Sequence, residues 1–283
     1  MASFTNFATL SYNGGTTNSN IVTGEILEAL TAVKTAVSAN YSAGDRITYA
    51  LSLVNTGTAA ITDYTVTDNL GGYTVGANTV YPLAYNAGTV RYYINGVLQT
   101  APTVTAGPPL TVTGLTVPAG GSAVLIYETT ATPVAPLATG SSITNTATIT
   151  GGGLTTPITA QATVETANSA DLTISKALSP TTVTENGRIT YTFVISNTGN
   201  TEATATGNVV VTDTFAPILR NIAVIYNGTA WTEGTNYTYN AATGVFTTLA
   251  GQITVPAATF TQNTDGTFTV MPGTATLVIT GTV

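Results

Sequence analysis

The sequence contains no cysteine and no histidine among its 283 residues. Without cysteine, disulfides and thiolate metal sites are excluded. Without histidine, the chain lacks the commonest general base and metal ligand. An enzyme would depend on paired carboxylates, as glycosidases do, and the 13 acidic residues are scattered with no motif around them. We therefore expect no enzymatic activity, no cofactor and no metal site. A Ca²⁺ site is an alternative, but no loop shows the ligand spacing of a known motif.

Charge and long apolar runs are also scarce. Lys and Arg together number 6 and the net charge is −7, so the basic surface that a nucleic acid requires is missing. No run reaches the ~18 apolar residues of a membrane span. The first residues have neither the basic nor the apolar region of a signal peptide. We expect either a mature form with a new Met1 or release by another route, such as lysis of a sporulating mother cell.

The residues that are abundant predict an all-β protein. Charged residues make up 7% of the chain, but 43% of the residues are hydrophobic, so disorder does not explain the low charge. Thr, Val, Ile and Tyr alternate in short runs between Gly, Pro and Asn, which is typical of an immunoglobulin-like sandwich. The stretch 24–37 contains a helix-like run, but its alignment with 164–178 favours a strand.

An internal repeat organises the chain, with a period of about 137 to 153 residues. The matching segments are 45–49 with 187–191, 55–57 with 197–199, 66–68 with 211–213, and 4–10 with 143–149. The first copy closes with two strands at 143–149 and 158–165, and the second copy has no counterpart of this pair. That counterpart instead occurs at the other end of the chain, in residues 4–10 and 21–28. We expect a donor strand pair at 1–28, a complete Ig-like sandwich at 29–166 and an incomplete acceptor sandwich at 170–283.

A sandwich without its last strands exposes open sheet edges, and such edges pair with any strand that is offered. Head-to-tail donation between copies does not close on itself, so it builds a filament. We expect the partner to be the protein itself, in a homopolymer outside the cell, on a cell or spore surface. The residues expected at this interface are Phe4, Asn6, Ala8, Leu10, Ile21 and Ile26. Two alternatives are closure within one chain, which the short link at 166–170 disfavours, and a sequence cut at arbitrary points that leaves the strand pair unpaired.

Each copy places one lysine, one aspartate and one asparagine on the apolar face of its strands. Lys34 and Lys176 are the two lysines of the chain, and they occupy equivalent positions. The remaining candidates are Asp68 and Asn145 for the first copy, and Asp213 with Asn6 for the second. A lysine on an apolar face is costly unless something neutralises it.

These three residue types permit a self-made isopeptide bond. Burial lowers the pKa of lysine and raises that of aspartate, so a neutral amine can attack the asparagine carboxamide while a protonated aspartate assists. We expect Lys34 to bond Asn145 within a subunit and Lys176 to bond Asn6 of the next subunit. Two simpler interpretations stay open: a buried Lys–Asp ion pair beside an asparagine bonded to backbone, or lysines that extend to solvent at a sandwich edge.

The sequence resembles the bacterial conserved-repeat surface domain, a domain of unknown function. The residues that carry this resemblance are Lys34, 44–49, 55–57, 66–70 and 143–148, and in the second copy Lys176, 188–191, 197–199 and 211–215. The chain is also similar to the isopeptide-forming domains of Gram-positive pilins, which place Lys in the first strand and Asn in the last. The resemblance implies an Ig-like fold, a surface location and a stalk or fibre role, with no enzymatic activity. The sequence departs from the pilin pattern because it has no C-terminal sorting motif and begins within a repeat, so we expect assembly to replace anchoring.

A surface adhesin or glycan-binding stalk module is the competing function. Trp231 lies near Tyr237 and Tyr239 in the sequence, and three aromatic rings can form a platform for a sugar. Such rings are more often core residues or cross-strand pairs.

Overall fold

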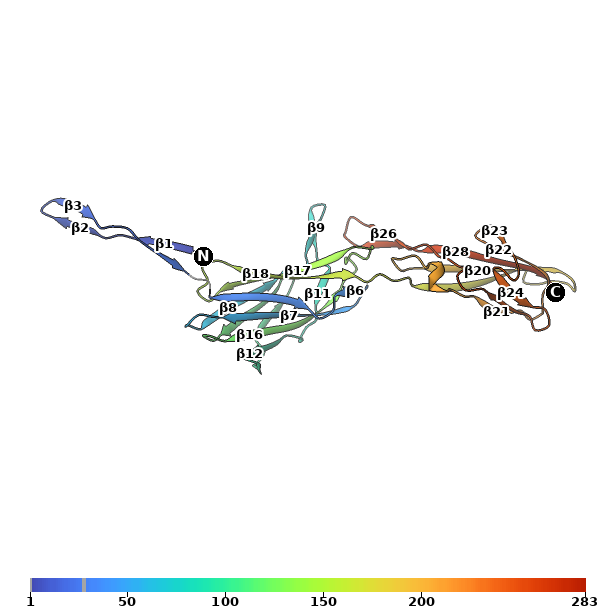
Figure 1. Cartoon of the computed structure of the whole chain (residues 1–283), viewed down its shortest axis with the longest axis horizontal. Coiled ribbons are helices and arrows are strands. Elements are labelled where there is room, and N and C mark those ends of the chain that lie inside the picture. Colours follow the sequence, from blue (N-terminus) through green and yellow to red (C-terminus); the bar gives the residue numbers. More distant parts are fainter. Residues whose placement is uncertain (1, 27–28) are drawn as a thin grey trace. The chain divides into compact units, whose positions relative to one another are not determined.

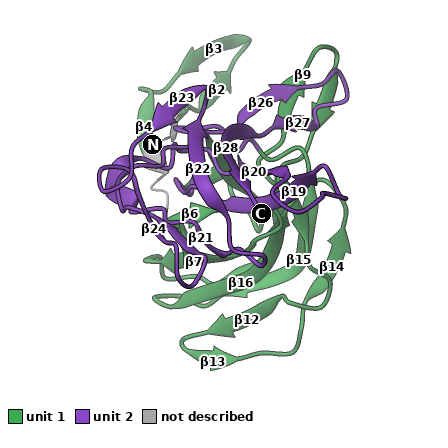
Figure 2. Ribbon diagram, turned by 90° about the vertical axis from the view of Figure 1, so that its right-hand side faces the viewer, with its two compact units in different colours: residues 1–135, 142–165 green, residues 136–141, 166–283 purple. Residues whose placement is uncertain are grey.

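The computed structural model describes residues 2–26 and 29–283. Apart from one 3-10 turn, η1 (Ala205–Gly207), the described secondary structure consists of β-strands (Figure 1). Two compact units form: unit 1 comprises residues 1–135 and 142–165, and unit 2 comprises residues 136–141 and 166–283 (Figure 2). The predicted all-β fold with tandem immunoglobulin-like sandwiches is confirmed.

Unit 1 contains two six-stranded sheets. The first has β5 (Leu30–Ala36), β7 (Arg46–Asn55), β11 (Leu83–Tyr85), β12 (Arg91–Ile94), β13 (Val97–Leu98) and β16 (Ser122–Ala131). Its order is β13-β12-β16-β7-β5, and β11 also pairs with β16. The second has β6 (Asn40–Tyr41), β8 (Ile61–Asp68), β14 (Thr103–Ala106), β15 (Leu110–Val117), β17 (Ser142–Gly151) and β18 (Ile158–Thr166), in the order β14-β15-β8-β17-β18-β6. A small hairpin of β9 (Tyr73–Val75) and β10 (Asn78–Val80) completes the unit.

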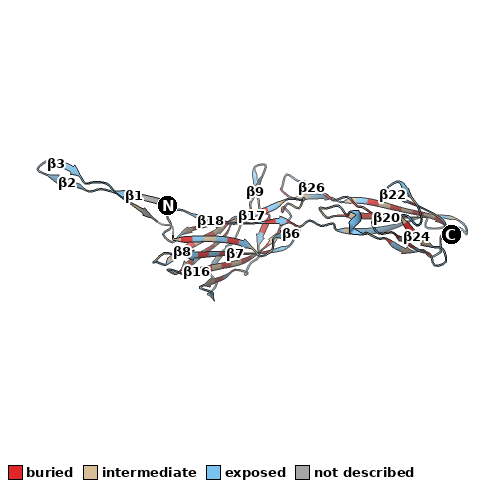
Figure 3. Cartoon of the chain, viewed as in Figure 1, coloured by how far each residue is buried: buried red, intermediate tan, exposed pale blue. Residues whose placement is uncertain are grey.

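The core of unit 1 lies between these sheets, and it forms because alternate residues of each strand face inward. In β7 the buried residues are Ile47, Tyr49, Leu51 and Leu53, each with no exposed surface. The burial colours alternate along the strands of this unit (Figure 3). The alternation read from the sequence at 47–53 therefore identifies the core face correctly.

Unit 2 repeats the first sheet but has a smaller second sheet. The first consists of β19 (Leu172–Ser179), β20 (Arg188–Asn197), β22 (Arg220–Tyr226), β23 (Thr229–Trp231) and β28 (Gly273–Thr282), in the order β19-β20-β28-β22-β23. The second has three strands, β21 (Thr212–Thr214), β24 (Tyr237–Asn240) and β25 (Val245–Thr248), in the order β21-β25-β24. A hairpin of β26 (Thr259–Gln262) and β27 (Phe268–Met271) is separate from both.

The two units differ at one edge of the second sheet. In unit 1, β8 pairs with β15 on one side and with β17 on the other. The equivalent strand of unit 2, β21, pairs with β25, and among the described residues no strand pairs with its other edge. The positions that β17 and β18 fill in unit 1 are therefore not filled by a strand of unit 2.

The N-terminal segment forms strand pairs that carry no core of their own. Strand β1 (Ala2–Asn6) pairs with β4 (Val22–Ile26), and β2 (Thr9–Tyr12) pairs with β3 (Gly15–Asn18). Residues 4 to 23 are all exposed (Figure 3). An isolated two-stranded hairpin is only marginally stable in water. Residues 2–26 belong to the segment predicted to be the donor strand pair, and for that predicted role we call them the donor hairpin from here on.

The described residues of the stretch 24–37 form strands rather than a helix. Residues 22–26 lie in β4 and residues 30–36 lie in β5, as the alignment of the two copies predicted, while residues 27–28 lie outside the described part. Among the described residues, none belongs to a helix that is long and apolar enough to cross a membrane.

Candidate functional site

In unit 1, the two sheets are joined by a buried ion pair. Lys34 lies on β5 in the first sheet, and its Nζ donates to Asp68 Oδ2 on β8 in the second sheet at 2.5 Å. The side chains are 0% and 1% exposed. The other carboxylate oxygen of Asp68 accepts a hydrogen bond from the Leu70 backbone N–H at 2.9 Å. Burying two opposite charges away from solvent is costly, and the direct contact between them at hydrogen-bonding distance offsets that cost.

Asn145 lies on β17, next to the strand that carries Asp68. Ala147 is the cross-strand partner of Asp68, and Asn145 is two residues before it, so its side chain points to the same face. Its carboxamide is 0% exposed, and neither Oδ1 nor Nδ2 makes a hydrogen bond of normal geometry within the described residues, although the side chain lies close enough to the Tyr49 and Tyr127 hydroxyls to lower the pKa of both phenols. A buried amide without partners costs about 1–3 kcal/mol. The alternative in which Asn145 bonds to backbone does not match this geometry.

Two tyrosines complete the surroundings of Lys34. The Nζ atom lies 4.8 Å from the ring centre of Tyr49 and 5.8 Å from that of Tyr127. The Tyr127 hydroxyl donates to the same Asp68 oxygen that accepts from Lys34. Tyr49 and Tyr127 face each other across β7 and β16. Neither tyrosine was predicted as part of the site, although the alternation at 47–53 places Tyr49 on the core face.

Burial shifts the pKa values of these groups. Removal from water lowers the pKa of Lys34 from 10.5 to about 8, against the opposing effect of the Asp68 carboxylate. Burial first, and then the Asp68 charge, raises the pKa of Tyr127 well above its usual value, while Asn145 acts in the opposite direction. The same first two causes raise the pKa of Tyr49. An amine with a lowered pKa, beside a carboxyl group that can take its proton and a free carboxamide, has the composition required for acyl transfer from asparagine to lysine.

Unit 2 has the same ion pair in a different environment. Lys176 Nζ donates to Asp213 Oδ2 at 2.5 Å, but the side chains are 40% and 17% exposed. Lys176 lies 4.5 Å from the ring centre of Tyr191, which is the counterpart of Tyr49. Where Tyr127 stands in unit 1, unit 2 has Ile279. Lys176 lies on the apolar face of β19, and its side chain is partly exposed because, among the described residues, no strand of unit 2 takes the place of β17 and β18.

The exposed face of β19 extends beyond the lysine. Ile174 is exposed, and Leu178 is partly so, although both lie on the face that packs inward in the equivalent strand β5. The structure therefore shows an apolar strip with a lysine in its centre at the edge of unit 2.

The predicted interface residues of the donor hairpin are exposed as well. Asn6, the proposed counterpart of Asn145, is exposed, and so are Phe4, Ala8, Leu10 and Ile21. The side chain of Ile26 lies outside the described part of the structure. The structure thus joins Lys34 to Asp68 and Lys176 to Asp213. It places Asn145 beside the first pair, but it does not bring Asn6 to the second pair.

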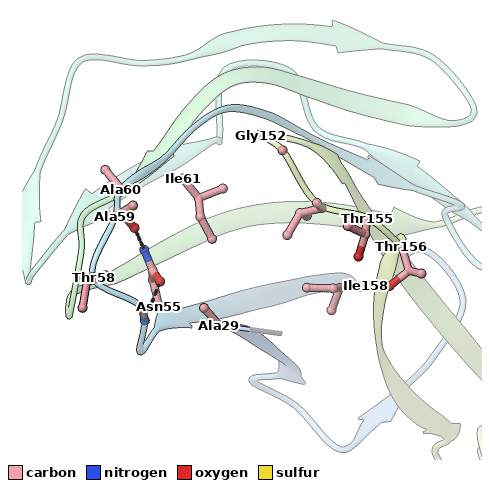
Figure 4. A pocket seen from close by; sticks show the side chains of 13 residues that line it. Ala29, Asn55, Thr58, Ala59, Ala60, Ile61, Gly152, Thr155, Thr156 and Ile158 are labelled. Atoms are coloured by element: carbon pink, nitrogen blue, oxygen red, sulfur yellow. Dashed lines mark hydrogen bonds between the residues drawn. The ribbon is translucent and has the colours of Figure 1, made fainter. Parts of the chain in front are cut away.

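A cavity of about 330 Å³ lies at one end of unit 1 (Figure 4). It is lined by Thr, Ala, Ile and Leu side chains and by glycines, together with Asn55, whose amide donates to the Ala59 carbonyl at 2.8 Å. None of its lining residues is charged. Across residues 2–26 and 29–283, no cluster of acidic side chains suited to a metal ion is found.

The aromatic platform suggested for glycan binding does not form. Trp231 packs on Tyr226 in a tilted arrangement with 4.7 Å between ring centres, and Tyr237 is buried against Phe246. Tyr239 packs on the core and donates its hydroxyl to the Leu219 carbonyl at 2.8 Å. Tyr237 is therefore a core residue, and Trp231 and Tyr239 are partly buried against the same core.

Comparison with known proteins gives weak structural similarity and no sequence match. No protein-family model matches the chain, and no curated protein sequence matches it. The resemblance to the conserved-repeat surface domain therefore stays a prediction.

Three of the similar solved structures are an adhesin domain and two pilus proteins of bacteria. The N-terminal domain of the adhesin Sgo0707 of Streptococcus gordonii is 15% identical, with a TM-score of 0.35, over 47% of this chain and 31% of that one. The pilus backbone protein RrgB of Streptococcus pneumoniae is 12% identical, with a TM-score of 0.36, over 86% and 55%. The major pilin BcpA of Bacillus cereus is 14% identical, with a TM-score of 0.35, over 96% and 73%. The chain spans about a third of the length of the adhesin domain and about half of the length of the RrgB structure. Similarity at this level carries no functional argument, so the proposal below depends on the geometry of this chain.

Proposed function

We propose that this protein is the structural subunit of an extracellular bacterial fibre on a cell or spore surface. Each subunit donates its N-terminal hairpin to unit 2 of a neighbour, which lengthens the fibre head to tail. One observation carries the proposal: the donor hairpin has the pairing of the strands that close unit 1, while unit 2 lacks such strands. The partner is a second copy of this chain.

The pairing of the donor hairpin supports this proposal in detail. In unit 1, Asn145 pairs with Ala162 and Ile143 pairs with Val164. In the donor hairpin, Asn6 pairs with Val22 and Phe4 pairs with Gly24, and these are the aligned counterparts. The Phe4 ring covers Gly24 so closely that a Cβ there would overlap the ring. The hairpin thus pairs a large residue with a glycine, where unit 1 pairs two residues of medium size, Ile143 and Val164.

The same template predicts the register with the neighbour. In unit 1, Ala147 lies opposite Asp68 and Ile149 lies opposite Val66. Through the repeat, Ala8 is expected opposite Asp213, and Leu10 opposite Val211. In the free hairpin the pairing shifts by one residue beyond Asn6, where Thr9 pairs with Asn18. To match the single register of unit 1, the pairing of β2 with β3 would have to shift by one residue when the hairpin docks.

Burial of apolar side chains supplies the driving force. Phe4 is 54% exposed and Leu10 is 66% exposed in the hairpin, and Ile174 is 54% exposed on the acceptor. Complete burial of one such side chain is worth about 1.5–3 kcal/mol. Docking also gives hydrogen-bond partners to the open edge of β21.

Isopeptide bonds are the second part of the proposal. Lys34 bonds to Asn145 within unit 1, with Asp68 assisting, and Lys176 bonds to Asn6 of the neighbour, with Asp213 assisting. The support comes from the buried pair in unit 1, with its low amine pKa and the unpartnered carboxamide beside it. Each bond releases one ammonia, so the mass falls by about 17 Da per bond.

Cysteine cross-linking tests the donation, because the native chain has no cysteine. Thr148 pairs with Thr67 in unit 1, so Thr9 is expected opposite Thr212 of the neighbour. The variant Thr9→Cys with Thr212→Cys, made in the Asn6→Ala background, is oxidised and run on non-reducing gels. We expect a ladder of multimers that collapses to monomer on reduction.

The matched control moves one cysteine by two residues on the same strand, to Thr214→Cys. It retains two exposed thiols, so random collision gives both variants the same ladder. Equal ladders, or a disulfide-closed monomer in place of multimers, would contradict donation between copies in this register.

A further inference from the structure

The two ion pairs have the same geometry but differ in their contact with water. Both lysines donate to their aspartate at 2.5 Å. The Lys34 side chain is 0% exposed, whereas that of Lys176 is 40% exposed. The strands that account for this difference are β17 and β18, which complete the second sheet of unit 1 and have no equivalent in unit 2.

We propose that Lys176 does not attack a carboxamide in the free subunit and becomes the nucleophile toward Asn6 when a donor hairpin docks and buries it. This inference rests on the proposed function, because the covering strands come from a second copy of the chain. The hairpin then has two roles: it brings the carboxamide of Asn6, and it removes the water that keeps the lysine charged.

The structure of unit 1 indicates how docking changes the lysine. An ammonium group in contact with water is stabilised in its charged form, which has no lone pair for attack. Where the same residue is enclosed, as at Lys34, burial lowers the pKa to about 8. Asp213 also loses its remaining contact with water on docking, which makes transfer of a proton from lysine to aspartate less costly.

Asn6 is also expected to become buried when the hairpin docks. It is exposed in the donor hairpin, whereas its counterpart Asn145 is buried without hydrogen-bond partners. After docking, the carboxyl group of Asp213 is the polar group expected beside the Asn6 carbonyl, by analogy with Asp68. Both reactants therefore lose their hydration in the same event that brings them together.

The reaction balances without any other reagent. The ammonium of Lys176 gives one proton to the carboxylate of Asp213, and the resulting amine attacks Cγ of Asn6. A second proton moves from the attacking nitrogen to the amide nitrogen of Asn6, and the bond from Cγ to that nitrogen breaks. Ammonia leaves, takes the proton back from Asp213 and becomes ammonium. A Cγ–Nζ amide forms, and the aspartate returns to its starting state.

Amine labelling of two full-length variants tests the inference. Asn6→Ala keeps the hairpin but cannot form the bond, so its fibres hold a docked and unbonded Lys176. Leu10→Asp places a charge on the docking face, so its subunits stay monomeric. Both are treated with a water-soluble acetylating reagent, and the acetylation of each lysine is followed by peptide mass spectrometry. The chain has two lysines, and Lys34, which is buried and bonded to Asn145 under the proposal, is expected to stay unlabelled in both variants, so acetylation reports on Lys176.

We expect Lys176 to react at least about 10-fold more slowly in the Asn6→Ala fibres than in the Leu10→Asp monomers. We also expect no covalent dimers from the Leu10→Asp chain at high concentration, although it retains Asn6. Equal labelling rates in fibres and monomers would overturn the inference and leave the fibre intact. Covalent dimers of the Leu10→Asp chain would overturn it as well. If neither the native chain nor Asn6→Ala forms fibres, the proposed function itself is wrong.

Discussion

The lowered pKa of Lys34 predicts how the stability of unit 1 depends on pH when its bond is prevented. The variant Asn145→Ala keeps Lys34 as a free amine. Its pKa is about 8 in the fold and 10.5 in the unfolded chain. Between these values the unfolded chain binds a proton that the folded chain does not, so the free energy of unfolding rises with pH. Below pH 8 the cost of burying the charged lysine is present in full.

The size of this effect follows from the same interval. One pKa unit corresponds to about 1.36 kcal/mol, so a rise from pH 8 to pH 10 adds about 2–3 kcal/mol. Above pH 10 the trend reverses, because burial raises the pKa of Tyr49 and Tyr127 and the unfolded phenols ionise first.

Urea unfolding at several pH values measures this change, in the Leu10→Asp background that keeps the chain monomeric. Trp231 is the single tryptophan, so its fluorescence follows unit 2 and identifies which transition in the circular dichroism signal belongs to unit 1. The control is Lys34→Met combined with Asn145→Ala, which has no amine to titrate. The reasoning is refuted if both variants show the same pH dependence between pH 8 and pH 10.

Four further predictions concern the bonds and the hairpin. The native chain is expected to lose about 17 Da within unit 1, and Asp68→Ala to keep its full mass because no carboxyl group assists the amine, as intact mass spectrometry will show. Tyr127→Phe removes the hydroxyl that donates to Asp68, so we expect the fold to persist with a larger fraction of unbonded chains; an unchanged fraction would exclude a role for this hydroxyl. Asn145→Ala opens a loop of about 110 residues that starts at Lys34, and we expect unit 1 to lose about 4–5 kcal/mol at pH 7, by analogy with a disulfide of that span. Native fibres boiled in detergent are expected to run as a ladder, whereas Asn6→Ala fibres should dissociate to monomers.

Much of the site could be predicted from strand alternation and from the repeat. Alternation placed Lys34 and Asp68 on inward faces, and the structure joins them. The repeat gave the equivalent pair of unit 2, because two copies of one sequence fold the same way locally. The pattern of a single strand does not show which strands cover it, however. The exposure of Lys176 therefore became visible only when the incomplete sheet was placed around it.

Contacts between distant strands were also outside the reach of sequence reasoning. Tyr127 meets Asp68 across 59 residues of sequence, and no local motif marks that contact. Trp231 shows the same limit of sequence reasoning. It was grouped with Tyr237 and Tyr239 because they are near in sequence, whereas the ring it contacts is that of Tyr226 on the adjacent strand.

The difference between the two units suggests why the same three residue types can serve two purposes. In unit 1 the lysine and the asparagine belong to one folded body, so under the proposed chemistry the bond forms as soon as the sheets close and reinforces a subunit. In unit 2 the lysine and aspartate are already paired, and in the proposed assembly the carboxamide and the covering strands come from the donor hairpin. If the bond requires that Lys176 be buried as well as close to Asn6, a brief collision between two subunits in solution does not form it. Under this mechanism the joints of the fibre become covalent one at a time, each after its register has been set by the paired strands.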